Sequence, residues 1–260
     1  MEVKRMAIEV KEEKFGSRPS MLEPLFKQNE IFYEKNIFVI TCRGEFNRST
    51  PSRYLILKEF LSSEEMQSRF LETISNFLKD FMRDRVWGCH LDEGKEAVKL
   101  LYKGETFTFS YRDFKELLLE SMDCKFERSS ARGSDEATPL SRFFREYLGK
   151  SVSVTDLDFF IPSSGYFLEE KTFVLEEDGG PEVYIGLGQF ISLRELRTDI
   201  LNPRAKILLI YTEDARIFYL KELSGKTEFR RKTVPGWGSG VSVRLDKTLE
   251  YEEFIKMLRG

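Results

Sequence analysis

A charged β-hairpin is the feature that most constrains how this chain folds. Residues 154–160 and 167–171 alternate apolar and polar side chains, which predicts two β-strands. The segment 162–165, Pro-Ser-Ser-Gly, lies between them and has the composition of a tight turn. The sequence therefore predicts a hairpin, with both strands rich in phenylalanine and in acidic residues.

Four charged side chains lie on this hairpin. Asp156 and Asp158 are two residues apart and are expected to share a face of the first strand. Glu169 and Lys171 are expected to share a face of the second strand in the same way. Asp158 is nearer the turn and better placed to face Glu169, so we favour Asp158 over Asp156 as the aspartate that acts with it.

The apolar neighbours of these charges indicate that the hairpin is buried. Phenylalanine, leucine, isoleucine and valine fill 159–161, 167–168 and 173–174, as in a strand covered on both faces. Charges inside such a hairpin are costly unless they are paired or bind a metal. The alternative is a solvated sheet face with ordinary cross-strand charge pairs.

This cluster has the chemistry of metal-dependent phosphodiester hydrolysis. Mg²⁺ or Mn²⁺ takes one or two protein carboxylates plus waters, and the sequence offers Asp158 and Glu169 as ligands. Asp156 would support the ligands without touching the metal. Lys171 would position or activate the attacking water, or hold the scissile phosphate as a point charge.

The spacing of Asp158, ten residues and then Glu169-x-Lys171 resembles the PD-(D/E)xK nuclease superfamily, including RecB-like nucleases and archaeal Holliday junction resolvases. Gln189 strengthens the resemblance, because RecB-like members carry a glutamine at the start of a helix after the third strand. Here a strand is expected over 183–187 and a helix over 189–199. The proline of the family name is absent, and Leu193 stands where RecB-like domains have tyrosine.

The resemblance covers roughly residues 138–235 and implies a restriction-endonuclease-like α/β core, a central mixed sheet flanked by helices. It implies catalytic roles for Asp158, Glu169, Lys171 and Gln189. Glu146, on a helix expected over 139–147, is implied as a further metal ligand. The implied activity is hydrolysis of DNA, with RNA left open, and a homodimer is compatible with it. The alternative is a catalytically inactive module of the same fold that binds nucleic acid or a protein.

Several basic residues and one tryptophan are candidates for contact with nucleic acid, since cations bind phosphate and aromatic rings stack on bases. They are Arg142, Arg145, Arg194, Arg230, Arg231, Lys232 and Trp237. Trp237 belongs to a glycine-rich segment, and packing toward the interior is its alternative. The formal net charge of −3 gives no global field that would attract nucleic acid, so any basic surface is local.

A polar, serine- and arginine-containing segment at 128–138 predicts a linker. It would divide an N-terminal α+β domain, residues 1–127, from a nuclease-like domain, residues 139–260. In the N-terminal part, apolar residues spaced three and four apart predict a long amphipathic helix over 64–83. A loop beside a DNA-binding surface is the alternative interpretation of the linker.

The cysteines predict neither a disulfide framework nor a zinc site, because Cys42, Cys89 and Cys124 are widely separated and odd in number. Cys89 precedes the one histidine, His90, and a Cys-His nucleophile pair was the lesser alternative to ordinary packing.

We expect a cytoplasmic protein, because the sequence shows neither a signal peptide nor a long apolar segment for a membrane. Charged residues form 33% of the chain and glutamine is rare, which hints at a thermophilic source.

Overall fold

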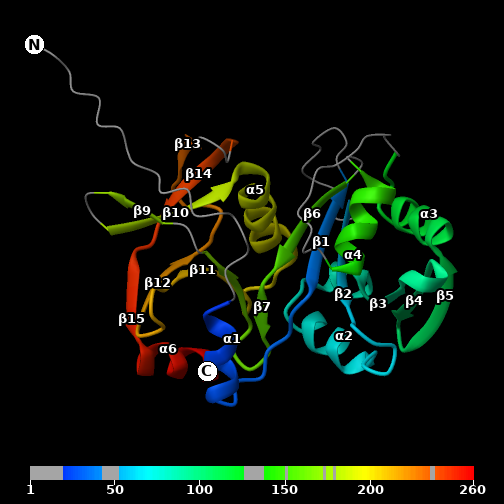
Figure 1. The fold of residues 1–260 in the computed structure, drawn as a ribbon, viewed down its shortest axis with the longest axis horizontal. Coiled ribbons are helices and arrows are strands. Elements are labelled where there is room, and N and C mark those ends of the chain that lie inside the picture. Colours follow the sequence, from blue (N-terminus) through cyan, green and yellow to red (C-terminus); the bar gives the residue numbers. More distant parts are fainter. Residues whose placement is uncertain are drawn as a thin grey trace, which may run out of the picture.

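The strands form three sheets, each assembled from segments far apart in the sequence. The computed structural model describes residues 20–42, 53–125, 138–149, 152–171, 174–177, 180–234 and 238–260. In Figure 1 the six-stranded sheet lies on the right and the other two sheets lie on the left. The prediction of an α/β chain with a mixed sheet flanked by helices is confirmed.

The six-stranded sheet has the order β5-β4-β3-β2-β1-β6. Its strands are β1 (Ile37–Cys42), β2 (Tyr54–Glu59), β3 (Val86–Asp92), β4 (Ala97–Tyr102), β5 (Glu105–Ser110) and β6 (Val152–Leu157). β2 and β3 run parallel, and the other neighbours are antiparallel. Because β6 follows the predicted linker in sequence, the halves on either side of that linker share this sheet.

The five-stranded sheet has the order β15-β12-β11-β8-β7. Its strands are β7 (Phe159–Ile161), β8 (Tyr166–Glu170), β11 (Lys206–Tyr211), β12 (Ile217–Glu222) and β15 (Lys247–Glu250). β8 and β11 are parallel, and the remaining pairs are antiparallel. This sheet carries the predicted hairpin.

The four-stranded sheet has the order β13-β14-β10-β9 and is antiparallel throughout. Its strands are β9 (Val174–Glu177), β10 (Gly180–Gly186), β13 (Arg230–Val234) and β14 (Gly238–Arg244). β10 extends the strand predicted over 183–187. Arg230 and Lys232 of the predicted basic run therefore lie on an edge strand.

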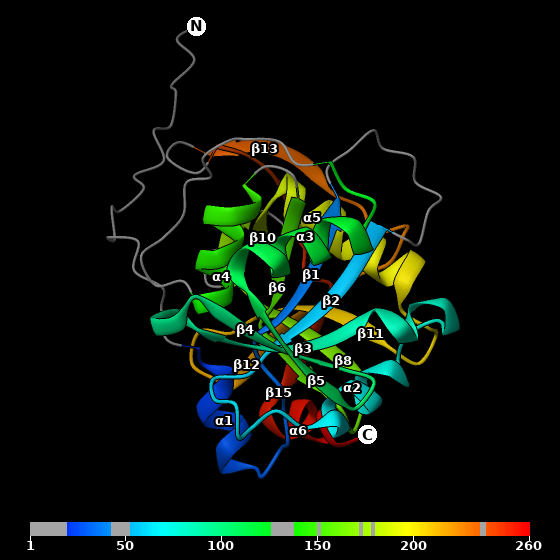
Figure 2. The same ribbon diagram turned by 90° about the vertical axis from the view of Figure 1, so that its right-hand side faces the viewer.

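The helices cover the sheets on several faces. They are α1 (Leu22–Gln28), α2 (Ser68–Ser75), α3 (Tyr111–Ser121), α4 (Pro139–Phe143), α5 (Leu187–Glu195) and α6 (Tyr251–Arg259). Figure 2 faces the six-stranded sheet, with α3 and α4 in the upper part of the view and α2 in the lower part. Among the described residues, no helix is long and apolar enough to cross a membrane.

Three apolar cores follow from the alternation of side chains along the strands. One core joins the six-stranded sheet to α3 and α4, and another joins the five-stranded sheet to α1 and α6. The third lies between the sheets and includes side chains from α2 and α5. Phe159 faces the α1 side and its neighbour Phe160 faces the central core, as expected when successive residues point to opposite faces.

The predicted helix over 64–83 is wrong in extent. α2 ends at Ser75, and a 3-10 helix follows over Asp80–Arg85. The backbone between them leaves the helical path because Leu78 bridges Leu201 and the Lys79 N–H donates to the Ile200 carbonyl at 2.9 Å. Tertiary hydrogen bonds therefore override the amphipathic periodicity.

The expectation of no disulfide is also wrong. Cys42 and Cys124 are bonded, with their Cα atoms 5.5 Å apart and a sequence separation of 82. Cys42 ends β1, and Cys124 follows α3, whose side chains pack in the same core as those of β1. The two cysteines are far apart in sequence, so the sequence alone could not show that folding brings them together.

Candidate active site

The β7–β8 hairpin is the framework of the site, and its register agrees with the predicted turn. Phe159 pairs with Leu168, and Ile161 pairs with Tyr166. The Gly165 N–H donates to the Ile161 carbonyl at 2.9 Å and closes the turn. β8 also pairs with β11 on its other side, so the second strand of the hairpin lies inside the five-stranded sheet.

Asp158 lies where the chain passes from one sheet to another. β6, which precedes it, pairs with β1, whereas β7, which follows it, pairs with β8. The predicted single strand is thus interrupted at Asp158. Asp156 is exposed on the edge strand of the six-stranded sheet. Asp158 is half-buried, and its Oδ2 accepts a hydrogen bond from the Glu170 N–H at 2.6 Å, so Asp158 is the aspartate that reaches β8.

Three of the predicted residues form one hydrogen-bonded group. Lys171 Nζ donates to Glu169 Oε1 at 2.5 Å and to Gln189 Oε1 at 3.3 Å. Gln189 Nε2 donates to the same Glu169 oxygen at 2.7 Å. Each of the three therefore contacts the other two, although Gln189 comes from a different element, α5.

The position of Gln189 results from how α5 starts. β10 ends at Gly186, and α5 begins at the next residue, so the first turn of the helix lies at the end of a central strand of its sheet. Side chains of α5 pack in the central core, the same core that receives Phe167 of β8. Glu169 shares a face of β8 with Phe167, which explains why the first turn of α5 meets it.

Glu169 is a buried carboxylate with one unsatisfied oxygen. The residue is 3% exposed, and its Oε2 has no hydrogen-bond partner among the described residues. Leaving a buried carboxylate oxygen without a partner costs free energy. Such an atom is where a water or a cation would be stabilised.

The charges of this group alter each other's titration. Burial raises the pKa of Asp158 well above its usual range, and the neighbouring Glu169 raises it further. Burial also raises the pKa of Glu169, against the opposing effect of the Lys171 ammonium. Burial alone would lower the pKa of Lys171, but the Glu169 carboxylate outweighs it and raises that pKa. Lys171 is therefore held as an ammonium.

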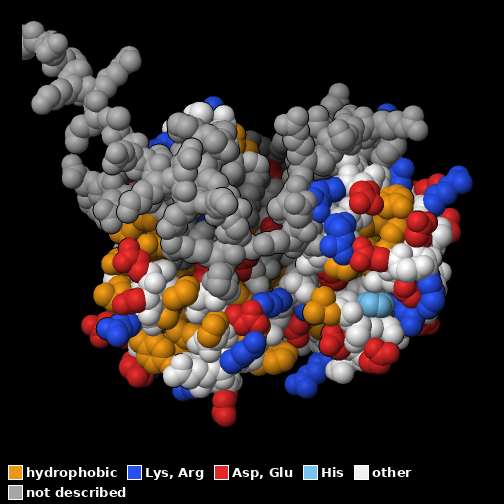
Figure 3. Space-filling model, in the orientation of Figure 1, with side chains coloured by type: hydrophobic (Ala, Val, Ile, Leu, Met, Phe, Trp, Pro, Cys, Tyr) orange, Lys and Arg blue, Asp and Glu red, His pale blue; other side chains and the backbone are white. Residues whose placement is uncertain are grey.

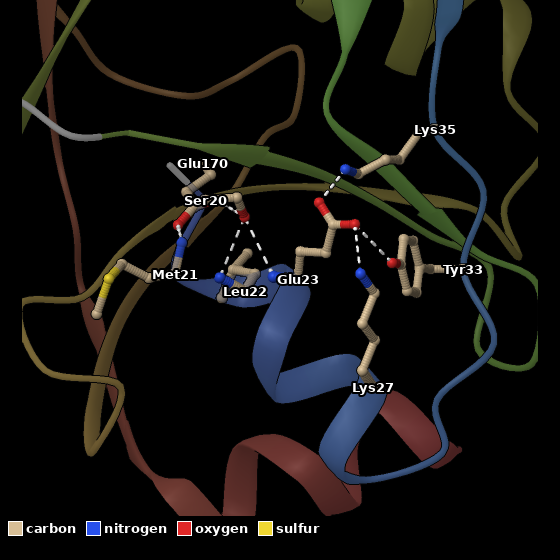
Figure 4. A network of polar contacts seen from close by, with 8 residues as sticks. All are labelled: Ser20, Met21, Leu22, Glu23, Lys27, Tyr33, Lys35 and Glu170. Atoms are coloured by element: carbon tan, nitrogen blue, oxygen red, sulfur yellow. Dashed lines mark hydrogen bonds and ion pairs between the residues drawn. The ribbon is translucent and has the colours of Figure 1, made fainter. Parts of the chain in front are cut away.

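Glu170 points to the opposite face of β8 and anchors α1. Its Oε2 accepts from Ser20 Oγ at 2.5 Å, and its Oε1 accepts from the Met21 N–H at 2.8 Å, as Figure 4 shows. Glu23, in the first turn of the same helix, accepts from Lys35 and Tyr33. Sequence reasoning missed this role, although strict alternation already separates Glu170 from Glu169.

The residues predicted on the preceding helix do not join the group. Glu146 is exposed in a π-helical turn, Phe144–Leu148. Within the described parts of the chain, no three or more His, Cys, Asp or Glu side chains are placed to hold one metal ion. Arg142 pairs with Glu93 through two hydrogen bonds, of 2.8 and 3.0 Å.

Arg145 lines a pocket that is separate from the group of Glu169, Lys171 and Gln189. It borders a pocket of about 230 Å³ between α4 and the edge strand β6, together with Asp156. The predicted cation and the exposed aspartate therefore lie on the same depression of the six-stranded sheet.

Two of the other predicted basic residues lie beside a glutamate that the sequence did not single out. Arg230 and Lys232 each lie 3.7 Å from the carboxylate of Glu182, on β10, and Arg231 is exposed. Glu182 is 2% exposed. The cations near it, Arg230, Lys232 and Arg244, lie far along the chain on β13 and β14. The sequence alone therefore offered no signal except a glutamate beside an apolar run. Trp237 lies outside the described residues.

Cys89 and His90 do not form a nucleophile pair. Cys89 is fully buried, and burial raises the pKa of its thiol well above the usual range. His90 Nδ1 lies 3.0 Å from the Phe60 carbonyl, so its ring is occupied by the backbone. Both residues therefore fit ordinary packing.

Neither protein-family models, nor curated proteins, nor solved structures give a match to this chain. The function must therefore be argued from the geometry of the site. Figure 3 shows acidic and basic side chains interspersed over the described part of one face, in keeping with the small net charge of −3.

Proposed function

We propose that this protein is a metal-dependent nuclease that hydrolyses phosphodiester bonds in DNA. The observation that carries the proposal is the contact group of Glu169, Lys171 and Gln189 beside Asp158. The same residues, in the same order along the chain, underlie the resemblance to PD-(D/E)xK nucleases and a restriction-endonuclease-like core.

Asp158 and Glu169 would hold Mg²⁺ or Mn²⁺. Two observations fit a divalent cation: Glu169 Oε2 lacks a hydrogen-bond partner among the described residues, and the Glu169 carboxylate, like burial, raises the pKa of Asp158. Two carboxylates completed by waters are a normal magnesium environment. When bound, the metal would neutralise phosphate charge and make a water more nucleophilic.

Lys171 supplies a fixed positive charge in this proposal. Its raised pKa favours the ammonium form, which donates hydrogen bonds. It would orient the attacking water or hold the scissile phosphate. Gln189 contacts both Lys171 and Glu169 and would fix the direction of their side chains.

A catalytically inactive module of the same fold is the second candidate. It is favoured by the exposure of Glu146 and by the absence of a three-residue metal set in the described structure. Glu169 would then be retained for its hydrogen bonds to Lys171 and Gln189 alone. Metal binding separates the two candidates.

The test is cleavage of labelled single-stranded, duplex and branched DNA with Mg²⁺, Mn²⁺ or EDTA. Glu169→Gln and Lys171→Met should each lower cleavage by roughly 100- to 1,000-fold, the usual cost of removing one preorganised charged group. Lys206→Met and Glu222→Gln are matched controls, since this exposed pair is joined at 2.9 Å on the same sheet. Both controls should retain activity.

Calorimetric titration with Mn²⁺ completes the test. The protein should bind Mn²⁺, and Asp158→Asn and Glu169→Gln should abolish binding. Cleavage that persists in both site variants would place the activity elsewhere. No cleavage together with no Mn²⁺ binding would select the inactive module.

A further inference from the structure

A second polar site lies on the far side of α5 from the hairpin. It is a pocket of about 570 Å³ bordered by β10, α5, β14 and the segment before β13. α5 contacts β10 and β14 (Figure 1), so the pocket walls belong to one packed unit. Nothing in the proposed chemistry at Glu169 uses this pocket.

Positive charge dominates the pocket lining. Arg194, Lys226, Arg230 and Arg244 face two carboxylates, Glu182 and Glu228. Cations at a concave surface concentrate the field on an anion more strongly than cations on a flat one. The ligand that suits this lining is therefore anionic.

Aromatic rings hold one of these cations in position. The Arg194 guanidinium lies 5.5 Å from the Phe190 ring centroid and 5.7 Å from that of Phe229. It also donates to the Gly225 carbonyl. An arginine fixed by stacking and by a backbone carbonyl is preorganised for a charge-assisted hydrogen bond. Phe229 itself is 39% exposed.

The floor of the pocket is polar, buried and incompletely satisfied. Glu182 and Ser242 are each 2% exposed and line the pocket. Among the described residues, Glu182 Oε2 and Ser242 Oγ have no hydrogen-bond partner. Arg230 and Arg244 lie 3.7 and 3.8 Å from the Glu182 carboxylate, beyond hydrogen-bond distance. The unpartnered Ser242 hydroxyl can donate to an anion. The Glu182 carboxylate would repel an anion, but Arg230, Lys232 and Arg244 lie within 3.8 Å of it and offset its charge.

We infer that this pocket binds a phosphate group of the nucleic acid strand whose hydrolysis is proposed above, and the inference rests on that proposed function. α5 carries Gln189 of the candidate active site and Arg194 of the pocket, five residues apart or about 7.5 Å along the helix axis. The two side chains also differ by about 140° around the helix, so one strand would reach both sites by passing over α5. Ser242 Oγ is a neutral donor to the same group.

The phosphate can be a terminal monoester or a diester of the backbone, and binding experiments distinguish them. We would measure fluorescence anisotropy with short single strands carrying a 5′-phosphate or a 5′-hydroxyl, in EDTA, with inorganic phosphate as competitor. Lys226→Ala and Arg230→Ala, both exposed side chains, should each weaken binding roughly tenfold, the effect of losing one charge-assisted contact. Arg216→Ala, an exposed cation elsewhere, is the control.

A variant of opposite sign sharpens the test. Glu228 is an exposed carboxylate of the lining, and Glu228→Gln should tighten binding several-fold because it removes repulsion of the anion. If only the 5′-phosphorylated strand responds to these variants, the group bound is the terminal phosphate. If both strands respond equally, it is a backbone phosphate.

Two results would overturn the inference: affinities of the Lys226 and Arg230 variants equal to that of Arg216→Ala, or no competition by phosphate. Binding is measured in EDTA, where no metal-dependent cleavage occurs. A failure of the pocket proposal can therefore be told apart from a failure of the nuclease proposal. Phosphate binding without metal-dependent cleavage would remove only the nuclease proposal. Cleavage with unchanged binding in the pocket variants would remove only the pocket.

Discussion

At the scale of residues, the site depends on the protonation states of Asp158, Glu169 and Lys171. Lys171 stays charged because Glu169 lies 2.5 Å away. The Lys171 ammonium lowers the pKa of both Asp158 and Glu169, whereas burial raises the pKa of both carboxylates. This imbalance, two buried acids against one base, is a property of the folded chain and predicts how stability changes with pH and with metal.

Asp158→Asn should be more stable than the natural protein at pH 8 in EDTA. The folded pKa of Asp158 is raised by burial and by Glu169, so the carboxyl binds its proton more tightly in the folded state. It therefore destabilises the fold increasingly as the pH rises above its unfolded value of about 3.9. The asparagine still accepts from the Glu170 N–H. Thermal melts should show a gain at pH 8 that disappears near pH 4.

Adding Mn²⁺ should reverse this ranking. A ligand at 100 times its Kd stabilises the folded state by about 2.7 kcal/mol, and only the protein with Asp158 should show that gain. A melting temperature of Asp158→Asn that is lower than that of the natural protein at pH 8 in EDTA would contradict the raised pKa.

At the scale of elements, the hairpin and α5 bring the candidate residues together. Alternation and turn composition were enough to predict the hairpin, its turn and the β8 residues, because those signals are local. The extent of α2 could not be predicted in the same way, since its end is set by pairing of Leu78 with Leu201. A local sequence pattern does not predict the end of a helix where a distant segment supplies the backbone hydrogen bonds.

Gly165→Ala should destabilise the hairpin more than the same change at Gly104. Both glycines have positive φ, of +73° and +83°, but an added Cβ at Gly165 would lie 2.4 Å from the Phe77 ring, while Gly104 has open space. The left-handed backbone costs about 1–2 kcal/mol at either site, and overpacking adds about 1–3 kcal/mol at Gly165. Urea unfolding of the two variants checks this. Equal losses in the free energy of unfolding would show that the Phe77 ring moves aside at little cost.

At the scale of the whole molecule, the segments before and after the predicted linker share a sheet and a core. β6 follows the predicted linker, yet it completes the sheet of the N-terminal part, and the central core takes side chains from both halves. The Cys42–Cys124 disulfide closes a long loop between the end of β1 and the segment after α3. The polar segment 128–138 suggested two domains because composition alone cannot show these long-range links.

Reducing the disulfide should lower the free energy of unfolding by about 3–5 kcal/mol, because its 82-residue separation restricts the unfolded chain strongly. The natural protein should unfold at lower urea concentration with dithiothreitol than without. The Cys42→Ser/Cys124→Ser double variant should match the reduced protein and ignore the reductant. A response of that variant to reductant would mean that the remaining thiol, Cys89, is involved.

The sequence by itself determined the α/β class, the β7–β8 hairpin and the candidates Asp158, Glu169, Lys171 and Gln189, because alternation and spacing are local properties of the chain. Only the tertiary structure decided that Asp156 is exposed on an edge strand while Asp158 accepts a hydrogen bond from β8, that Glu146 is exposed, and that cations surround Glu182. Those outcomes depend on which distant strands pair, and pairing is chosen by burial of the whole core, which no short pattern encodes.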